Sequence, residues 1–429
     1  MIAVTQQMRA LVGGSSLRRN ISLTLGRQVL TACAQLMLVV LIARKLGPTG
    51  NGQYAMAILL PTLMVNLLNF GVGPATVYHV GRGTFSARHA FWGNLRLGVV
   101  IAIIGVAIVI PVLVALGSTL FPGVPQTLLL IGLVTFPATL LRGYLQSILQ
   151  GVEDFWPFNL LIVLPPYIAL VGAAVGLYGF NAGLTSAVGA YMLGEIIAVM
   201  LSAHLVLKRA AIRDHGYDPW DSREYQRTTI RYGVQAHLSN VLTFINYRAD
   251  IYLVNLFLNP AATGVYVVAV QIAERLWMIS QATSTVLFPK LSAMESSPIQ
   301  RLALTRTSQR AVLILTAGVG VLVAIPLYWF LGIVFGVEYV DALPIYLSLL
   351  PGIIAGAGAR VQAHCIAAAG KPNWNMYVAC GVVSANVMLN SILVPVYGVL
   401  GAAFATSVVY LGDAGSKGLI IRKMLTRQA

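Results

Sequence analysis

Three long segments of this 429-residue chain contain no aspartate, glutamate, lysine or arginine: residues 46–81, 97–141 and 372–412. A transmembrane helix needs about 20 consecutive apolar residues, so each segment is long enough for about one and a half to two crossings. Each segment must therefore contain most of a helical hairpin.

Helix caps, Pro and Gly breaks and isolated charges divide the rest of the chain in the same way. The predicted spans lie near residues 21–46, 52–80, 89–116, 125–150, 155–178, 183–207, 228–258, 262–288, 303–335, 340–368, 374–396 and 399–421. These runs are apolar on all sides and about twice as long as a barrel strand, which argues against a β-barrel. We predict an all-α integral membrane protein with twelve transmembrane helices.

The two halves of the chain contain a repeat. LGPTGNGQYAMA at residues 46–57 returns as LNPAATGVYVVA at residues 258–269, with five of the twelve positions identical. Six helices per half is an even number, so both halves enter and leave on the same side and are predicted to be parallel repeats. We interpret the repeated turn as an outer-face hairpin with an architectural role.

The longest polar stretch lies between the two halves. The predicted organisation is a cytoplasmic N-terminal segment (1–20), an N-lobe of helices 1 to 6 (21–207), a cytoplasmic linker (208–227), a C-lobe of helices 7 to 12 (228–424) and a cytoplasmic tail (425–429).

Composition supports a membrane protein, because 58% of the residues are hydrophobic, 10% are charged and the mean hydropathy is +0.80. Basic residues gather in every second predicted loop and at both ends, which places the termini in the cytoplasm by the positive-inside rule. Most of the net charge of +15 follows from this topology. Nucleic acid is therefore not an expected partner, whereas membrane lipids are.

No motif points to a cofactor or to covalent chemistry. The chain has no Gly-rich phosphate loop of the GxxxxGK[ST] type, which argues against ATP hydrolysis. Cys33, Cys365 and Cys380 lie in apolar segments without metal or redox spacing, so we interpret them as small hydrophobic residues. We expect no cofactor, no metal site and no enzymatic activity.

Charged residues inside the predicted spans are the strongest functional candidates, because a charge at the bilayer centre costs at least about 2.5 kcal/mol and tends to face a cavity or a partner. Arg248, Asp250, Glu274 and Arg275 lie near the middle of spans seven and eight, and Gln271 shares a helix face with Glu274. Arg248 and Asp250 are two residues apart, so they point to different faces. These residues are candidates for a water-filled cavity.

Arg142 and Arg360 occupy near-equivalent positions in spans four and ten. Glu195 and Asp413 also correspond between the halves, so we expect Arg142 to pair with Glu195 and Arg360 to pair with Asp413, unless these arginines contact a substrate. These two acidic residues, with Asp250 and Glu274, are also candidates for proton or sodium coupling.

Two further pairs complete the cavity candidates. Arg27 and Arg96 lie one or two turns inside the cytoplasmic face, and arginine suits phosphate because its planar fork binds phosphate oxygens with two hydrogen bonds. Asn66 and Asn69 on span two could contact sugar hydroxyls, or could form hydrogen bonds between packed helices. Basic residues outnumber acidic ones among the candidates, which favours an anionic substrate.

Six local sequences, in this order, resemble the polysaccharide repeat-unit flippases of the Wzx type: LGPTGNGQYA, NFGVGPATVYHVGRG, LQGVEDFWPFN, YRADIYLV, NPAATGVYVVAVQIAERLW and LFPKLS. The superfamily also contains the multidrug and toxin extrusion (MATE) transporters and the peptidoglycan lipid flippases. The resemblance covers about residues 20 to 424. It implies two six-helix lobes around a central cavity, alternating access, and flipping of undecaprenyl-diphosphate-linked oligosaccharides to the outer leaflet.

The sequence therefore predicts a lipid-linked oligosaccharide flippase of the bacterial plasma membrane. Peptidoglycan lipid flippases usually carry two further helices, so the resemblance favours surface polysaccharide or O-antigen synthesis, with a polysaccharide polymerase and glycosyltransferases as partners. Two alternatives stay open at this point. One is an ion-coupled multidrug extruder of the same superfamily, and the other is a membrane-embedded polymerase or glycosyltransferase.

Overall fold

The computed structural model describes residues 15–213, 223–294 and 298–426. Within them every regular element is a helix. Most of the predicted N-terminal segment, the middle of the predicted linker and the end of the predicted tail lie outside the described residues.

The chain divides into two compact units, and each combines segments that are distant in sequence. Unit 1 is Met1–Ile42, Ala57–Gly117 and Pro125–Leu238, and unit 2 is Ala43–Met56, Ser118–Val124 and Ser239–Ala429. Short segments of the first half thus belong to unit 2, and the beginning of the second half belongs to unit 1. The predicted lobe boundaries at residues 207 and 228 stay predictions.

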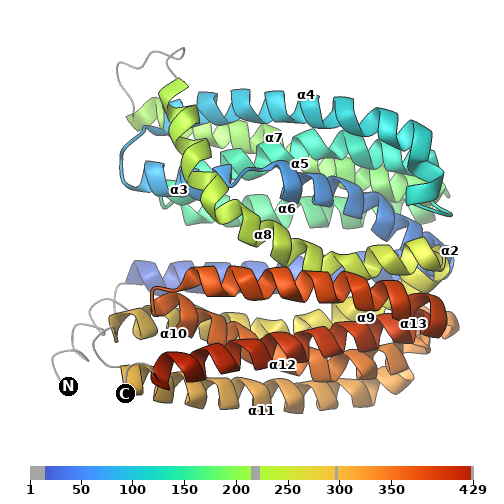
Figure 1. The fold of residues 1–429 in the computed structure, drawn as a ribbon. Helices are drawn as coiled ribbons and strands as arrows, with labels where there is room; N and C mark the ends of the chain where they lie inside the picture. The colour runs from blue at the N-terminus through green and yellow to red at the C-terminus, as the bar shows by residue number, and fades with distance from the viewer. Residues whose placement is uncertain (1–14, 214–222, 295–297, 427–429) are drawn as a thin grey trace. The chain divides into compact units, whose positions relative to one another are not determined.

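In the part of unit 1 that the structure describes, seven α-helices lie wholly or in part. They are most of α2 (Ser15–Leu68), α3 (Val72–Gly81), α4 (Ala87–Leu120), α5 (Gln126–Gly151), α6 (Phe155–Ala174, extended by the π-helical η1, Val175–Gly179), α7 (Gly183–Arg213) and the first part of α8 (Arg223–Phe257). Helix α5 packs against α7 and α3, and α6 packs against α7, as the ribbon shows (Figure 1). One core cluster joins Phe91, Leu149, Leu161 and the fully buried Tyr225.

The first part of α8 is held in unit 1 by polar contacts. The Tyr225 hydroxyl lies 2.8 Å from Thr76 Oγ1 and donates to Asn94 Oδ1 at 2.9 Å. Further along the helix, a Cβ on Gly233 would come within 2.5 Å of the Phe70 carbonyl oxygen, so the backbones touch there. The predicted seventh span therefore starts on a helix whose first turns are already held against unit 1.

Unit 2 is built around α12 (Ala342–Ala368). It packs against α13 (Pro372–Thr426), α11 (Pro298–Phe330), α10 (Trp277–Ala293) and α9 (Pro260–Arg275), and short helices η2 (Leu331–Phe335) and η3 (Val337–Tyr339) follow α11. Helix α9 begins sharply because Asn259 accepts a hydrogen bond from the Ala262 amide at 2.9 Å and Pro260 occupies the first turn.

Two long helices contain a break at a glycine. Gly47 in α2 has φ 66° and ψ −170°, and Gly398 in α13 has φ 61° and ψ −145°. Both values lie in the region where a side chain is strained, so glycine permits the chain to turn there. The breaks fall where the sequence predicts the ends of spans 21–46 and 374–396.

The predicted span 52–80 is interrupted. Helix α2 ends at Leu68 and α3 begins at Val72, because Phe70 and Gly71 both have positive φ, 48° and 68°. The Asn69 side chain stabilises this turn by accepting a hydrogen bond from the Gly71 amide at 2.8 Å. The sequence reading missed a local stop signal of the Asx type.

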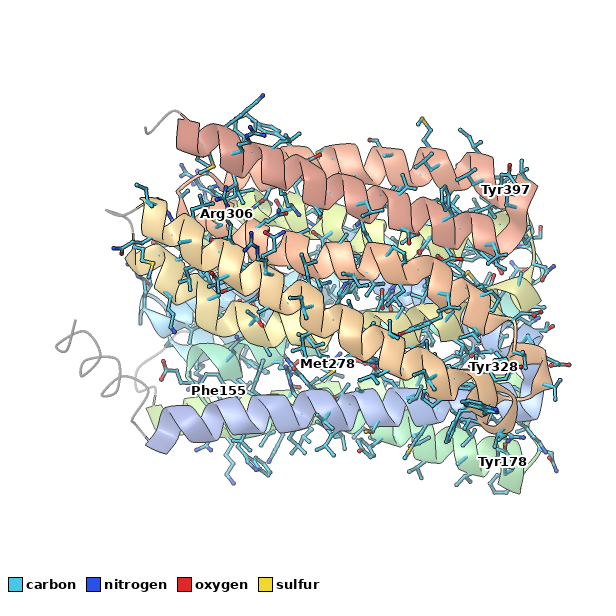
Figure 2. All side chains as sticks on the ribbon, turned by 90° about the horizontal axis from the view of Figure 1, so that it is seen from below. Phe155, Tyr178, Met278, Arg306, Tyr328 and Tyr397 are labelled. Atoms are coloured by element: carbon cyan, nitrogen blue, oxygen red, sulfur yellow. The ribbon has the colours of Figure 1, made fainter. Side chains whose placement is uncertain are left out.

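Within the described residues, nine helices are long and apolar enough to cross a membrane. Two of them contain the glycine breaks, and α8 is not among the nine. The prediction of twelve spans therefore stays a prediction. In unit 2, Arg306 and Tyr328 lie at opposite ends of α11 (Figure 2), about 33 Å apart along a helix that rises 1.5 Å per residue. That length matches a hydrocarbon core of about 30 Å.

The two copies of the repeated turn contact each other inside unit 2. A Cβ on Gly52 would lie 1.8 Å from the Pro260 carbonyl oxygen, and a Cβ on Gly264 would lie 2.0 Å from the Pro48 carbonyl oxygen. Asn51 donates to the Gly264 carbonyl at 3.0 Å. Equivalent glycines thus face equivalent prolines, a reciprocal contact that only glycine allows and that explains why these positions match in the repeat.

Candidate functional site

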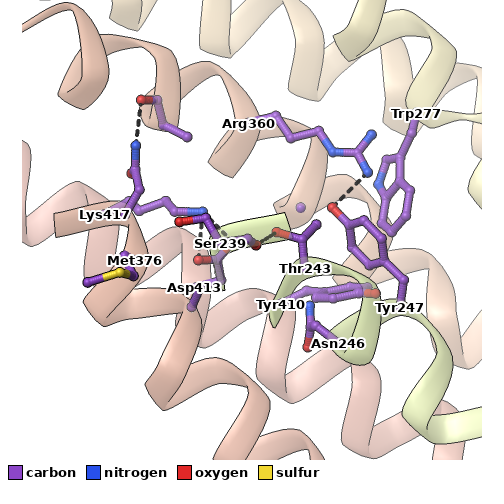
Figure 3. Close-up of a pocket in the computed structure, with 14 residues that line it drawn as sticks. Ser239, Thr243, Asn246, Tyr247, Trp277, Arg360, Met376, Tyr410, Asp413 and Lys417 are labelled. Atoms are coloured by element: carbon purple, nitrogen blue, oxygen red, sulfur yellow. Dashed lines mark hydrogen bonds and ion pairs between the residues drawn. The ribbon is translucent and has the colours of Figure 1, made fainter. Parts of the chain in front are cut away.

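A cavity of about 220 Å³ opens among four helices of unit 2 (Figure 3). Helix α8 contributes Tyr247, α10 contributes Trp277, α12 contributes Arg360, and α13 contributes Tyr410. The cavity therefore combines three aromatic side chains with one guanidinium group.

The aromatic rings and Arg360 form one connected cluster. The Arg360 guanidinium carbon lies 3.9 Å from the Trp277 ring centroid and 5.5 Å from that of Tyr247, and Arg360 Nη2 donates to the Tyr247 hydroxyl at 3.0 Å. Tyr410 completes the cluster, with its ring centroid 5.5 Å from that of Trp277. We call these four side chains the aromatic-arginine cluster.

Trp277 is fixed from the far side. It is 5% exposed, and its Nε1 donates to the Ile353 carbonyl at 3.1 Å. The ring therefore has one orientation, which holds the guanidinium by a cation–π contact. The cluster is preorganised by packing rather than by an ion pair.

The predicted pairing of Arg360 with Asp413 is wrong. Asp413 instead binds Lys417 at 2.8 Å, one turn further along the same helix. Residues at i and i+4 are neighbours on one helix, so Lys417 reaches the Asp413 carboxylate without any contact between helices. Arg360 lies on a different helix, and the ion pair forms with the lysine instead. Both Asp413 and Lys417 line the same cavity as Arg360 (Figure 3).

The corresponding pairing in unit 1 is confirmed. Arg142 Nε lies 2.6 Å from Glu195 Oε2, and Arg142 Nη2 lies 3.3 Å from Glu195 Oε1. The side chains are 17% and 4% exposed, and Arg142 Nη1 donates to Gln146 at 3.2 Å. This two-bonded geometry is typical of an arginine that stabilises the packing of two helices.

Asp250 is the second notable group of unit 2. It is 3% exposed and accepts hydrogen bonds from the Tyr266 hydroxyl at 2.7 Å, the Ile251 amide at 2.8 Å and the Thr406 hydroxyl at 3.3 Å. No basic side chain lies within ion-pair distance of it in the described part of the chain. Neutral groups thus supply the hydrogen bonds of this buried carboxyl group.

The neighbouring charges of unit 2 pair with each other. Arg248 binds Glu274 with two hydrogen bonds, at 3.0 and 3.3 Å, and the side chains are 35% and 20% exposed. Gln271 and Arg275 lie half-buried on α9. The structure therefore pairs Arg248 with Glu274, while Asp250 lies close enough to both for an electrostatic interaction but forms no ion pair among the described residues.

Three other candidates in unit 1, Asn66, Asn69 and Arg27, contact groups outside the buried ion pair of that unit. Asn66 and Asn69 donate to carbonyls of their own helix, Thr62 at 2.8 Å and Val65 at 2.9 Å. These bonds lie within one helix and use one N–H of each side-chain amide, so contact with sugar hydroxyls stays a prediction. Arg27 lies 6.0 Å from the Phe158 ring, and Arg96 is half-buried on α4.

The sequence reading missed Tyr247, Trp277, Tyr410 and Lys417, which complete the cavity. One signal was available, because Tyr410, Asp413 and Lys417 follow the i, i+3, i+7 spacing of one helix face. The contribution of Tyr247 and Trp277 depends on which helices pack together, and the sequence of a single chain does not contain that information.

Three comparisons place this chain among known proteins. Residues 17–295 match the family described as polysaccharide biosynthesis protein. A segment of 188 residues is 24% identical to the "probable low-salt glycan biosynthesis flippase Agl15" of Haloferax volcanii, and it covers 43% of this chain and 39% of that protein. The chain therefore matches well under half of the length of that relative.

Two solved structures share the fold. The lipid II flippase MurJ in an inward closed conformation gives a TM-score of 0.78 at 15% identity, over 94% of this chain and 87% of that chain. An inward-facing multidrug resistance MATE family transporter of the MOP superfamily gives 0.69 at 14% identity, over 92% and 95%.

These similarities agree with the nine apolar helices, so the chain is a multi-pass membrane protein with the fold of that superfamily. The family match covers more than half of the chain, from unit 1 into the helices α8 to α10 that carry Asp250 and Trp277. The chain therefore belongs to the polysaccharide biosynthesis protein family.

Proposed function

We propose that this protein flips lipid-linked oligosaccharide repeat units, carried on undecaprenyl diphosphate, from the cytoplasmic to the outer leaflet of a bacterial plasma membrane. The observation that carries the proposal is the aromatic-arginine cluster, which lines a cavity inside an apolar helical unit. Aromatic rings contact the apolar faces of sugars, and a guanidinium binds anionic oxygens. Membership of a polysaccharide family supports the same conclusion.

In this proposal the isoprenoid chain stays in the bilayer while the polar part crosses through the protein by alternating access. Arg27, Arg96 and Arg275 are the candidates for the diphosphate. Arg248 is held by two hydrogen bonds to Glu274, so it would bind phosphate only after that pair opens. The proposal contains no covalent step.

Asp250 is our candidate for coupling to a proton or sodium gradient. A carboxyl group that is 3% exposed, is hydrogen-bonded by neutral donors and forms no ion pair in the described part of the chain would gain from binding a cation. Glu195 and Asp413 are weaker candidates, since each already pairs with a basic side chain. Glu274 is engaged in the same way.

An ion-coupled multidrug extruder is the second candidate function. The fold shared with a multidrug transporter and the unpaired Asp250 favour it. Against it, the cavity carries Arg360 and Lys417 against one carboxylate, a balance that repels cationic drugs. A polymerase or glycosyltransferase is supported by no observation of comparable weight.

Orientation and partners complete the proposal. We propose that both termini lie in the cytoplasm, since basic residues gather at both ends and in every second predicted loop. Glycosyltransferases that build the repeat unit and a polymerase that uses it are the proposed functional partners, with membrane lipids as the surroundings.

The test is export of surface polysaccharide in a strain that lacks this gene. We expect the wild-type gene to restore export, and we expect Arg360→Gln to restore it poorly at equal protein level. Arg306→Gln is the matched control, because it removes one exposed arginine from a helix end of the same unit. Normal polysaccharide in the deletion strain, together with new drug sensitivity, would favour the extruder.

A further inference from the structure

Two arginines at equivalent positions in the two units have different binding partners. Arg142 lies nine residues before Gly151 and Arg360 lies ten residues before Gly370, each on a helix that ends just before or at that glycine. Arg142 is bound by two oxygens of Glu195. Arg360 has no carboxylate within ion-pair distance in the described residues, because the corresponding Asp413 is bound to Lys417.

This difference leaves Arg360 with unused binding capacity. Its Nη2 donates to a tyrosine hydroxyl. Within the described residues its Nη1 is buried and has no hydrogen-bond partner, and its charge is balanced by ring faces and by no carboxylate. A guanidinium in an apolar span is costly without an anion, and cation–π contacts offset only part of that cost. An anionic group that enters the cavity would supply the missing partner.

The size of the cavity limits the molecule that can carry this anionic group. Its volume of about 220 Å³ is below the roughly 300–1,000 Å³ of pockets that enclose a whole drug-sized ligand, so it suits one sugar ring at a time. Tyr247 and Tyr410 offer apolar ring surface, and Ser239 and Thr243 offer hydroxyl groups at its edge (Figure 3).

We propose that this cavity is a subsite for an acidic sugar, a hexuronate within the lipid-linked glycan. The carboxylate replaces the Tyr247 hydroxyl as the acceptor at Nη2 of Arg360, and the sugar ring lies against Tyr247 and Tyr410. Trp277 is a positioning residue that holds the guanidinium flat. The inference rests on the proposed flippase function and adds the chemical class of the sugar.

The test uses two substrates that differ in one group: a lipid-linked oligosaccharide that contains a glucuronate, and the same molecule after reduction of its carboxyl group to give glucose. Flipping of both is measured with the full chain in proteoliposomes, for wild type, Arg360→Gln, Arg360→Lys and the control Arg306→Gln. Thermal stability of each variant is measured alongside, so that misfolded protein is recognised.

We expect Arg360→Gln to weaken apparent affinity for the acidic substrate by about 10- to 100-fold, the usual size of a hydrogen bond to a charged group, and to change the neutral substrate little. Arg360→Lys keeps the charge but loses the fork, so it should fall between wild type and Arg360→Gln. Arg306→Gln should behave as wild type with both substrates.

Three outcomes separate the ideas. Equal loss with both substrates would mean that Arg360 contacts the diphosphate or acts through the fold, and would overturn the acidic-sugar subsite while the flippase function stands. No loss with either substrate, in stable protein, would overturn it too. If wild type flips neither substrate at all, the proposed function itself fails.

Discussion

Removal of one partner of the Arg142–Glu195 pair should strongly destabilise unit 1. Glu195 is 4% exposed, and Arg142 donates to both of its carboxylate oxygens. Replacing Glu195 by Met leaves a buried guanidinium without its anion, which costs about 3–5 kcal/mol in comparable buried pairs. Among the hydrogen bonds of Arg142 in the described residues, the one to Gln146 at 3.2 Å remains, and a neutral amide compensates little of that loss.

Replacement of both partners gives the opposite result. With Arg142→Met and Glu195→Met together no buried charge remains at this position, so we expect stability close to wild type or above it. The assay is reversible unfolding of the purified protein in mixed micelles, in which the free energies of the single and double variants form a thermodynamic cycle.

The reasoning fails in two ways that the cycle distinguishes. If a single substitution lowers the free energy of unfolding by less than about 1 kcal/mol, the Arg142–Glu195 pair behaves like an exposed ion pair, which contributes almost nothing to stability. A double variant as unstable as the single one would show that the cost comes from lost packing and not from the unpaired charge. Either result would also remove the contrast between Arg142 and Arg360.

Three further predictions concern other sites. Gly52→Ala should abolish folded yield, because its Cβ would lie 1.8 Å from the Pro260 carbonyl oxygen, whereas Gly381→Ala, with open space around its Cβ, should be tolerated in the same expression assay. Tyr225→Phe should lower the free energy of unfolding by about 1–3 kcal/mol, since the buried partners of its hydroxyl lose a hydrogen bond. Asp250→Asn should keep the fold but abolish the response of transport to an imposed proton or sodium gradient, and a full response in the variant would exclude Asp250 as the coupling group.

The repeat made part of the site predictable. Arg142 with Glu195 and Arg360 with Asp413 correspond between the halves, and the first pair forms as expected. The second does not, because Lys417 lies one turn from Asp413 and has no basic counterpart one turn after Glu195. Correspondence between the repeats predicts which residues occupy equivalent positions. Which ion pair forms also depends on the other charged side chains nearby, such as Lys417 beside Asp413.

The helices were predictable because apolar runs of this length allow little else. Their ends were less so. The stop after Leu68 depends on Asn69, Phe70 and Gly71, a short polar turn signal inside an apolar run. The aromatic-arginine cluster lies at the other extreme, because it joins four helices whose packing no local pattern in one sequence specifies.

We propose that this protein moves a lipid-linked glycan across the bilayer, and reconstituted flipping is the decisive experiment. Proteoliposomes would contain a fluorescent undecaprenyl-diphosphate oligosaccharide, and a membrane-impermeant reductant would quench the fluorophores in the outer leaflet. If the protein is a flippase, vesicles with the wild-type protein lose nearly all fluorescence. Vesicles with the Arg360→Gln protein lose their fluorescence more slowly. In protein-free vesicles the half of the fluorescence in the inner leaflet stays protected. The same protection in vesicles with the wild-type protein, under every imposed ion gradient, would contradict the flippase function.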